Sequence, residues 1–122
     1  MLGVILFRND LRLIDNPVLV EAIVKGSATS LLPIFIWDVA FYGKDAKTWN
    51  FKLPRSSPAK ERFLWESVQD LQDQLKTKGS DLLVFKGNPL DIIKTRLLPH
   101  LGKYYNATYL TYIMYICLKI RK

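Results

Sequence analysis

An apolar run, a polar turn and an apolar-periodic stretch open this chain, and their order constrains its fold more than any other feature. Residues 2–7 predict a buried strand, and residues 18–24 predict a helix because their apolar side chains recur at three- and four-residue spacing. In an α/β sheet, such a turn lies at the carboxyl end of a strand, where these folds bind ligands. Charges gathered there require partners, and those partners bear on function. The polar residues of the turn are Arg8, Asn9, Asp10, Arg12, Asp15 and Asn16.

The rest of the chain alternates in the same way. Short apolar runs predict strands at 31–37, 82–85 and 107–111, and amphipathic periodicity predicts helices at about 59–78 and 89–98. The resulting order predicts an α/β fold with a doubly wound parallel sheet of about four strands and three helices. We expect this sheet to be incomplete, because doubly wound domains usually continue beyond a fourth strand.

Prolines refine these boundaries. Pro17 and Pro89 suit the first position of a helix, which favours Asn16 and Asn88 as the N-caps. Pro99 is expected to end the last helix. Pro33 cannot donate a ladder hydrogen bond, so it is expected near the start of its strand or at a sheet edge.

Charge is distributed unevenly along the chain. The net charge is +7, yet every acidic residue lies at or before Asp91. The last 31 residues carry six Lys or Arg and no acid. This tail is either a nucleic-acid footprint or, as we favour, a segment of unusual composition.

Several classes of protein are excluded or disfavoured by composition. A single cysteine excludes an internal disulfide, and a single histidine leaves no histidine cluster for a metal. Neither glycine-rich phosphate-binding motif occurs, which disfavours ordinary dinucleotide enzymes and P-loop proteins. The first apolar run is too short for a signal peptide, and no stretch is long enough to span a bilayer. We therefore expect a soluble intracellular protein without a membrane partner or a metal site.

The candidate site residues each allow two interpretations. Trp37 and Asp38 could stack on and hydrogen-bond a planar heterocycle, or Asp38 could only cap the following loop. The charged turn could be an internal salt-bridge network or a docking surface for a domain or cofactor, and both can hold together. Lys60 and Arg62 stand near a helix start, where the helix dipole opposes cations, so an anion nearby would explain them. Asn88 could open an anion site, although a simple capped turn is favoured.

Four segments, in order, resemble the photolyase/cryptochrome family, and in particular the DASH cryptochromes. The opening strand is followed by the family's Arg-x-Asp-Leu-Arg and Asp-Asn pattern, here Arg8 to Arg12 and Asp15-Asn16. The resemblance covers roughly residues 2–111. The other three segments are Leu-Pro-Ile-Phe-Ile-Trp-Asp at 32–38, Arg-Phe-Leu-Trp-Glu-Ser-Val-Gln-Asp-Leu at 62–71, and Gly-Ser-Asp-Leu-Leu-Val-Phe-Lys-Gly-Asn-Pro at 79–89.

The resemblance implies a Rossmann-like N-terminal domain that packs on a helical FAD-binding domain absent from this sequence. In the family this domain often holds an antenna chromophore, methenyltetrahydrofolate or a deazaflavin, which passes excitation energy to FAD. Trp37 and Asp38 would line the antenna site, Lys60 falls where deazaflavin-binding relatives carry a basic residue, and the charged turn would face the FAD domain. The family repairs pyrimidine dimers in DNA or senses blue light, so DNA would be met only through a full-length parent.

The family pattern ends near Thr111. Relatives carry acidic residues after the fourth strand, whereas residues 112–122 here contain none. We expect a partial α/β domain at 1–111 and a divergent apolar and basic tail, with truncation, alternative splicing or a gene-model error as its origin. Such a chain would hold no catalytic residue and would not repair DNA alone. The alternatives are a stand-alone nucleotide- or flavin-binding module, or a non-enzymatic fragment whose tail touches nucleic acid or membrane.

Overall fold

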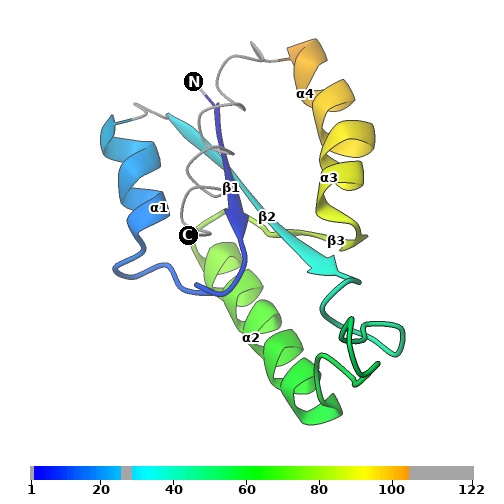
Figure 1. Ribbon diagram of the computed structural model, residues 1–122. Coiled ribbons are helices and arrows are strands. Elements are labelled where there is room, and N and C mark those ends of the chain that lie inside the picture. Colours follow the sequence, from blue (N-terminus) through cyan, green and yellow to red (C-terminus); the bar gives the residue numbers. More distant parts are fainter. Residues whose placement is uncertain (1, 26–28, 105–122) are drawn as a thin grey trace.

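Three parallel strands form the sheet of this protein, whose computed structural model describes residues 2–25 and 29–104 (Figure 1). The strands are β1 (Leu2–Phe7), β2 (Ser30–Asp38) and β3 (Leu83–Gly87), and they lie in the order β1-β2-β3. Phe7 pairs with Phe35, and Phe35 pairs with Val84. The α/β prediction is confirmed, while the strand expected at 107–111 lies outside the described residues.

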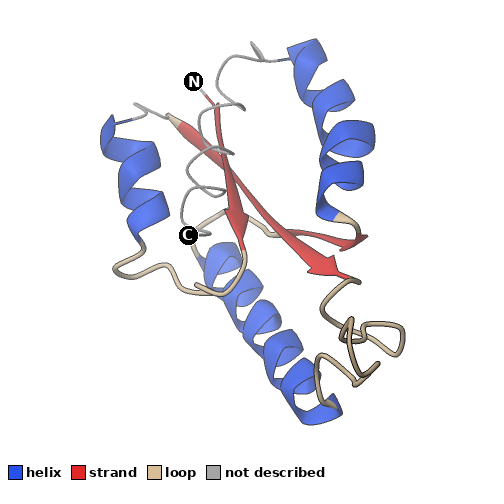
Figure 2. Ribbon diagram, in the orientation of Figure 1, coloured by secondary structure: helices blue, strands red, loops and turns tan. Residues whose placement is uncertain are grey.

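Helices connect the strands in every crossover of this sheet (Figure 2). After β1, α1 (Pro17–Val20) continues as the π-helical turn η1 (Glu21–Lys25). The long helix α2 (Pro58–Thr77) connects β2 to β3. After β3, α3 (Pro89–Ile92), the π-helical turn η2 (Ile93–Leu97) and α4 (Leu98–Tyr104) follow without a break. Each predicted helix is therefore present.

Successive side chains of a strand point to opposite sides of the sheet, and helices cover both sides, so the sheet is buried on both faces. One core contains Phe7 and Phe35 together with Val68 and Leu71 of α2. The other contains Val4, Ile34 and Ile36 together with residues of α3, η2 and α4. In Figure 1, α1 and α2 accordingly lie on one side of the sheet and α3 and α4 on the other. This is the doubly wound arrangement that the sequence predicts.

Helix α2 shows how local signals fix these boundaries. The Ser57 hydroxyl accepts a hydrogen bond from the Lys60 amide, and Pro58 occupies the first helical position. At the other end, Gly79 adopts a φ of 78°. Its amide donates to the Lys76 carbonyl, and the Ser80 amide donates to the Leu75 carbonyl, which completes a Schellman motif.

Two proline predictions are wrong. Pro33 lies inside β2, at the centre of the described sheet, where it is buried and pairs with Ile5. The pairing of β2 with β3 begins one residue later, so β3 does not need the missing amide. Pro99 lies within the last helix rather than ending it. In the π turn just before it, the Leu98 amide donates to the Ile93 carbonyl, and this wider turn accommodates the proline.

Candidate functional site

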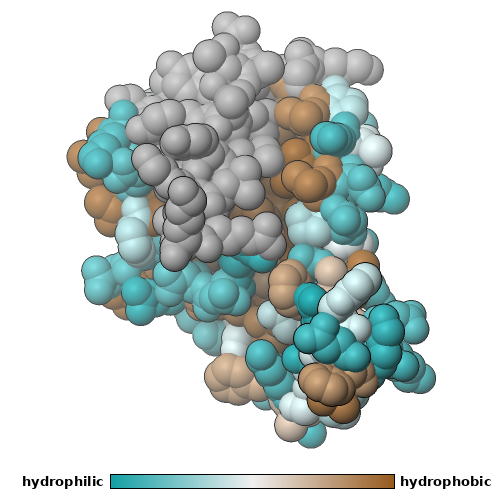
Figure 3. Space-filling view, viewed as in Figure 1, coloured by the Kyte–Doolittle hydropathy of each residue, from teal (hydrophilic) through white to brown (hydrophobic). Residues whose placement is uncertain are grey.

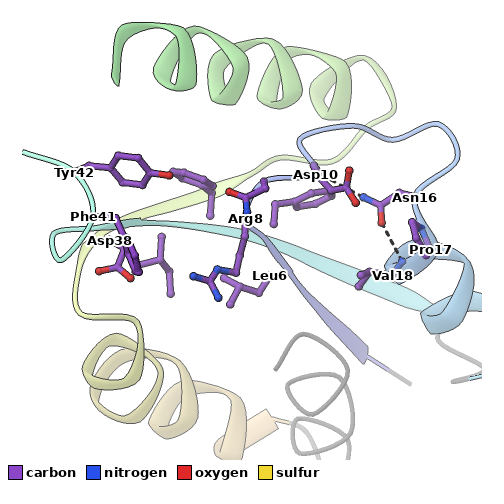
Figure 4. Close-up of a pocket in the computed structure, with 13 residues that line it drawn as sticks. Leu6, Arg8, Asp10, Asn16, Pro17, Val18, Asp38, Phe41 and Tyr42 are labelled. Atoms are coloured by element: carbon purple, nitrogen blue, oxygen red, sulfur yellow. Dashed lines mark hydrogen bonds between the residues drawn. The ribbon is translucent and has the colours of Figure 1, made fainter. Parts of the chain in front are cut away.

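A cavity of about 630 Å³ lies at the carboxyl ends of β1 and β2 (Figure 4). It is the position at which open α/β sheets bind ligands. Its lining combines apolar strand residues with the polar turn and the start of the loop after β2. Predicted site residues that line it are Arg8, Asn9, Asp10, Asn16 and Asp38.

Asn16 holds the polar turn in place from a buried position. Its Oδ1 accepts a hydrogen bond from the Val18 amide at 3.0 Å, which caps α1. Its Nδ2 donates to the Arg12 carbonyl at 3.0 Å and to the Asp10 carbonyl at 3.4 Å. Only 2% of Asn16 is exposed. One side chain therefore closes the turn and starts the helix.

The charged side chains of the turn form few ion pairs with one another. The Arg12 guanidinium approaches the Asp10 carboxylate at 3.6 Å and donates to the Asp15 carbonyl. Both members of this pair are more than half exposed, so the pair stabilises the fold little. Within residues 2–25 and 29–104, no acidic side chain pairs with Arg8. The turn is thus held by Asn16 rather than by a salt-bridge network.

Arg8 directly follows the last paired residue of β1, and Asp38 is the last residue of β2, where it pairs with Gly87. Leu6 and Ile36 pack on the side of α3, and two residues later Arg8 and Asp38 fall on that same side. Figure 4 shows both side chains on one side of the sheet edge, with Asp10 and Asn16 on the other. Arg8 is half-buried, and its cationic side chain lines the cavity next to the apolar residues Leu6 and Ile36.

Asp38 also shapes the loop after β2. It is 8% exposed, and its Oδ1 accepts a hydrogen bond from the Ala40 amide at 2.9 Å. Its carbonyl accepts from the amides of Phe41 and Tyr42 at 3.1 and 3.0 Å. Both readings of Asp38 are therefore compatible with its position: it caps the loop, and it lines the cavity.

Trp37 and Lys60 do not line the cavity. Trp37 points to the side of α2, where its ring lies 5.1 Å from that of Tyr42 and 6.1 Å, edge-on, from that of Trp65. It supports Tyr42, which does line the cavity. Lys60 is exposed in the first turn of α2. Arg62 pairs with Glu66 at 3.0 Å, which supplies the anion expected near it.

Sequence reasoning missed the aromatic and aliphatic part of the lining. A signal was available for two of these residues, because loops that follow parallel strands gather at the same sheet edge as the ends of those strands. Asp38 ends β2, and the aromatic pair stands three and four residues later. The missed residues include Leu6, Phe35, Ile36, Phe41 and Tyr42.

The long loop after β2 is joined to α2 by Glu61. The carboxylate accepts hydrogen bonds from the Ser56 hydroxyl and from the Gly43 amide, the latter at 2.8 Å. These bonds favour the charged form, first Ser56 and then Gly43, and lower the pKa of Glu61 below its ordinary value. The base of the loop, which carries Phe41 and Tyr42, is thereby positioned over the cavity.

Asn88, the other candidate for an anion site, has an ordinary structural role. The Asn88 side chain accepts from the amides of Leu90 and Asp91, as expected for a simple helix cap. His100 is exposed, and Cys117 lies outside the described residues. In the part of the chain that the structure describes, no three His, Cys, Asp or Glu side chains gather as metal ligands. No described helix is long and apolar enough to cross a membrane.

Comparison with known proteins identifies relatives of this chain. The sequence pattern of the family described as DNA photolyase matches residues 3–112. Cryptochrome DASH of Xenopus laevis is 42% identical over 89 residues, which are 73% of this chain and 16% of that protein. Cryptochrome DASH, chloroplastic/mitochondrial, of Solanum lycopersicum is 35% identical over 105 residues, 86% of this chain and 16% of that protein. The (6-4)DNA photolyase of Arabidopsis thaliana is 40% identical over 91 residues.

A solved structure supports the same relationship. The archaeal photolyase from Sulfolobus tokodaii, described as containing two FAD molecules and as implying a novel light-harvesting cofactor, superposes with a TM-score of 0.64. The two sequences are 30% identical, and the match covers 80% of this chain and 20% of that one. The chain spans about a sixth of the length of its curated relatives and corresponds to their Rossmann-like N-terminal α/β domain. On this evidence the chain belongs to the DNA photolyase family.

Proposed function

We propose that this chain is an antenna-chromophore-binding domain of a blue-light-dependent photolyase or cryptochrome, with its site in the cavity at the ends of β1 and β2. The observation that carries the proposal is that one cavity combines aromatic and aliphatic walls with Arg8, whose guanidinium forms no ion pair with an acidic side chain of residues 2–25 and 29–104. A volume of about 630 Å³ falls in the range of small-molecule sites. Family membership and the light-harvesting cofactor named for the archaeal relative support it.

The residues present fit a planar, partly anionic chromophore. Phe41 and Tyr42 offer aromatic surface, while Leu6 and Ile36 offer an apolar floor. Arg8 would hold an anionic tail, such as the glutamate of a folate or the phosphate of a flavin, through charge-assisted hydrogen bonds. Asp38 would accept a hydrogen bond from a ring N–H. Methenyltetrahydrofolate and a deazaflavin both have these features, and FAD shares them.

Such a chromophore supplies absorption of near-ultraviolet or blue light and transfer of that energy to a flavin. The chain's own residues bind it, orient its ring and keep it apart from water. Trp37 would act through Tyr42, against which its ring packs, rather than by touching the chromophore. Lys60 would contact it only if the ligand extended past the loop. We assign the domain to residues 1–111, with 112–122 outside it.

The proposal also covers the activity of the full-length protein to which this domain would belong. A helical FAD-binding domain would receive the energy and use it for light-driven repair of pyrimidine dimers or for photoreception. The polar turn from Arg8 to Asn16 would face that domain. In this proposal the chain binds and orients the chromophore, and catalysis would belong to the FAD-binding domain rather than to this chain alone.

The test is a titration of the purified chain with methenyltetrahydrofolate, a deazaflavin and FAD, followed by absorption and by retention of the chromophore on gel filtration. We expect at least one to be retained with a shifted spectrum. Arg8→Gln should weaken its binding by about tenfold, the size of one charge-assisted hydrogen bond. Arg62→Gln removes an exposed cation elsewhere and should leave binding unchanged. A folded chain, judged by far-ultraviolet circular dichroism, that retains none of the three would overturn the proposal.

A stand-alone nucleotide- or flavin-binding module is the second candidate. It is favoured by one observation, that all residues lining the cavity lie between Leu6 and Tyr42, in one continuous stretch of this chain. Retention of FAD in preference to both antenna chromophores would select this candidate. Retention of a folate or deazaflavin would select the antenna.

A further inference from the structure

A small hairpin in the loop after β2 presents aromatic side chains to solvent. Residues 47–54, hereafter the aromatic hairpin, contain an antiparallel bridge between Lys47 and Pro54. In Figure 3, brown apolar surface interrupts the hydrophilic surface at the lower right, the region of this loop in Figure 1. None of the residues 47–54 lines the cavity, so the function proposed above does not use them.

The aromatic hairpin is an ordered turn rather than an open loop. The Thr48 amide donates to the Leu53 carbonyl at 2.8 Å, and the Leu53 amide donates to the Thr48 hydroxyl at 3.1 Å. The Lys52 amide donates to the Thr48 carbonyl at 3.2 Å. Just outside, the Arg55 amide donates to the carbonyl of Ala46, which is buried and anchors the base. The tip is therefore held in one conformation before it meets any partner, which lowers the entropy lost on binding.

Large aromatic rings are displayed at this tip. Trp49 is 84% exposed and Phe51 is 78% exposed. Side chains of this kind usually bury most of their surface, so two of them on one short turn indicate an interaction site. Because each ring is a rigid plane, it can bind another flat group by stacking with little entropy loss.

Cations accompany these rings. The Lys52 ammonium lies 5.5 Å from the centre of the Trp49 ring, and the Arg55 guanidinium lies 5.0 Å from that of Phe41. The whole connection 39–57 contains four basic residues and one acidic residue, Asp45. The surface thus combines exposed stacking faces with net positive charge. The basic residues are Lys44, Lys47, Lys52 and Arg55.

We propose that the aromatic hairpin binds single-stranded nucleic acid, with Trp49 and Phe51 stacking on bases and the basic residues of the same loop contacting phosphates. Single-stranded nucleic acid carries flat bases, which stack on aromatic rings, and regularly spaced phosphates, which attract cations. Neither contact depends on the base sequence. The Asn50 amide, between the two rings, can hydrogen-bond a base edge. A membrane surface is the less suitable partner, because Asn50 and Lys52 interrupt the apolar residues and only Trp49, Phe51 and Leu53 could insert.

The experiment measures the anisotropy of fluorescein-labelled oligo(dT) and oligo(rU) as the full-length chain is added at low salt. We expect saturable binding that weakens as salt is raised, because phosphate contacts release counterions. The double variant Trp49→Ala/Phe51→Ala should bind at least tenfold more weakly, in keeping with the cost of losing base stacking. Lys44→Gln/Lys47→Gln/Lys52→Gln should reduce the dependence on salt. Equal binding of both oligomers means recognition of bases and phosphates, and a preference for one means that the sugar is read as well.

Matched controls separate this surface from other features of the chain. Ile14→Ala removes an apolar side chain that is also 84% exposed, and Lys76→Gln/Lys78→Gln removes cations at the far end of α2. Both should bind as the parent does. The variant Lys119→Gln/Arg121→Gln/Lys122→Gln tests the basic tail. Loss of binding in the tail variant, with the aromatic double variant unaffected, would overturn the proposal.

Two further results would also overturn it. One is the absence of any oligonucleotide binding by a chain that circular dichroism shows to be folded. The other is binding to vesicles of anionic phospholipid that depends on Trp49 and Phe51, without binding to either oligonucleotide. Since no chromophore is required, failure here leaves the cavity proposal intact, and failure of chromophore binding leaves the hairpin proposal intact.

Discussion

Two helices of this protein begin with the same dipeptide, yet the two asparagine N-caps make different hydrogen bonds. Asn16-Pro17 opens α1 and Asn88-Pro89 opens α3. In both, the asparagine Oδ1 accepts from the amide two residues later, at 3.0 and 2.9 Å. Only Asn16 uses its Nδ2 as well, since it closes the polar turn by donating to two carbonyls. Asn16 is buried, whereas Asn88 is exposed.

The difference lies in the segment that precedes each helix. Nine residues separate the end of β1 from the start of α1, and their path must be fixed by something inside the turn. Only Asn88 separates β3 from α3, and the reversal is made by the backbone of Gly87 at a φ of 145°. The same local signal therefore starts a helix in both cases, and only at Asn16 does it also hold a turn that lines the cavity.

The largest effect is expected from Asn16→Ala. The variant loses the helix cap and two hydrogen bonds inside a buried part of the turn, which should lower the free energy of unfolding by about 2–3 kcal/mol. Because the turn lines the cavity, chromophore binding should fall with it. Urea denaturation measures the first quantity and the absorption titration the second.

Asn16→Asp divides this effect into its parts. The carboxylate still accepts from the Val18 amide but cannot donate to the Arg12 carbonyl. An intermediate loss of stability is expected, and a loss as large as that of the alanine variant would assign the whole effect to the two donated bonds. Unchanged stability in both variants would contradict the role given to Asn16.

Gly87→Ala tests the other start, with an expected loss of about 1–2 kcal/mol. A Cβ at this position would meet Ile92 Cδ1 at 3.2 Å, and a φ of 145° is unfavourable for alanine. Adding Ile92→Val removes the Cδ1 atom. It should recover the stability lost to the steric contact but not the stability lost to the unfavourable φ. Gly43→Ala, at a φ of 103° with no atom within 4 Å, is the control for backbone strain alone.

Asn88→Ala should cost about 1 kcal/mol, the ordinary value for an exposed N-cap. It should leave chromophore binding unchanged, because Asn88 does not line the cavity. Urea denaturation and the absorption titration, performed as for Asn16→Ala, provide the comparison. If the two alanine variants lost equal stability, the distinction between the two helix starts would fail.

The sequence predicted these starts and the doubly wound order because both depend on local patterns. Asparagine followed by proline predicts a cap, and the alternation of apolar runs with amphipathic stretches predicts the crossovers. It was wrong at Pro99, since a π turn, which no local residue signals, carries the helix past the proline. Pro33 was misplaced because the staggered register of β2 and β3, a tertiary feature, decides whether an amide is needed there.

Part of the cavity lining was predicted for the same reason. The polar turn and Asp38 were placed correctly at the sheet edge by the ends of their strands. The orientation of Trp37 toward α2 follows from the alternation of β2, and that alternation would have excluded it from the face that carries Asp38. Phe41 and Tyr42 were missed although they closely follow the end of β2, because spacing alone does not show which side chains of the loop turn toward the cavity.

The third helix start, Ser57-Pro58 of α2, sharpens the comparison with the smallest expected effect. Here the preceding loop is held by Glu61, as the polar turn is held by Asn16, but Glu61 lies near the surface. Its pKa is lowered in the folded protein, first by Ser56 and then by Gly43. Hydrogen bonds to this carboxylate therefore contribute stability above the ordinary pKa of 4.5, and the contribution is lost as the pH falls through the lowered value.

Glu61→Gln should consequently melt at a slightly lower temperature than the parent at pH 7, and the two melting temperatures should converge in acid. Asp81→Asn is the control, because the pKa of Asp81 is also lowered, by the Leu82 amide and then by Gln72, at a place remote from the loop. Only the Glu61 variant should accelerate hydrogen exchange of the Gly43 amide, which donates to that carboxylate. A Gly43 amide that exchanges equally fast in the parent and in Glu61→Gln would show that the loop after β2 is held by its own turns. Glu61 would then not hold its loop in the way that Asn16 holds the polar turn.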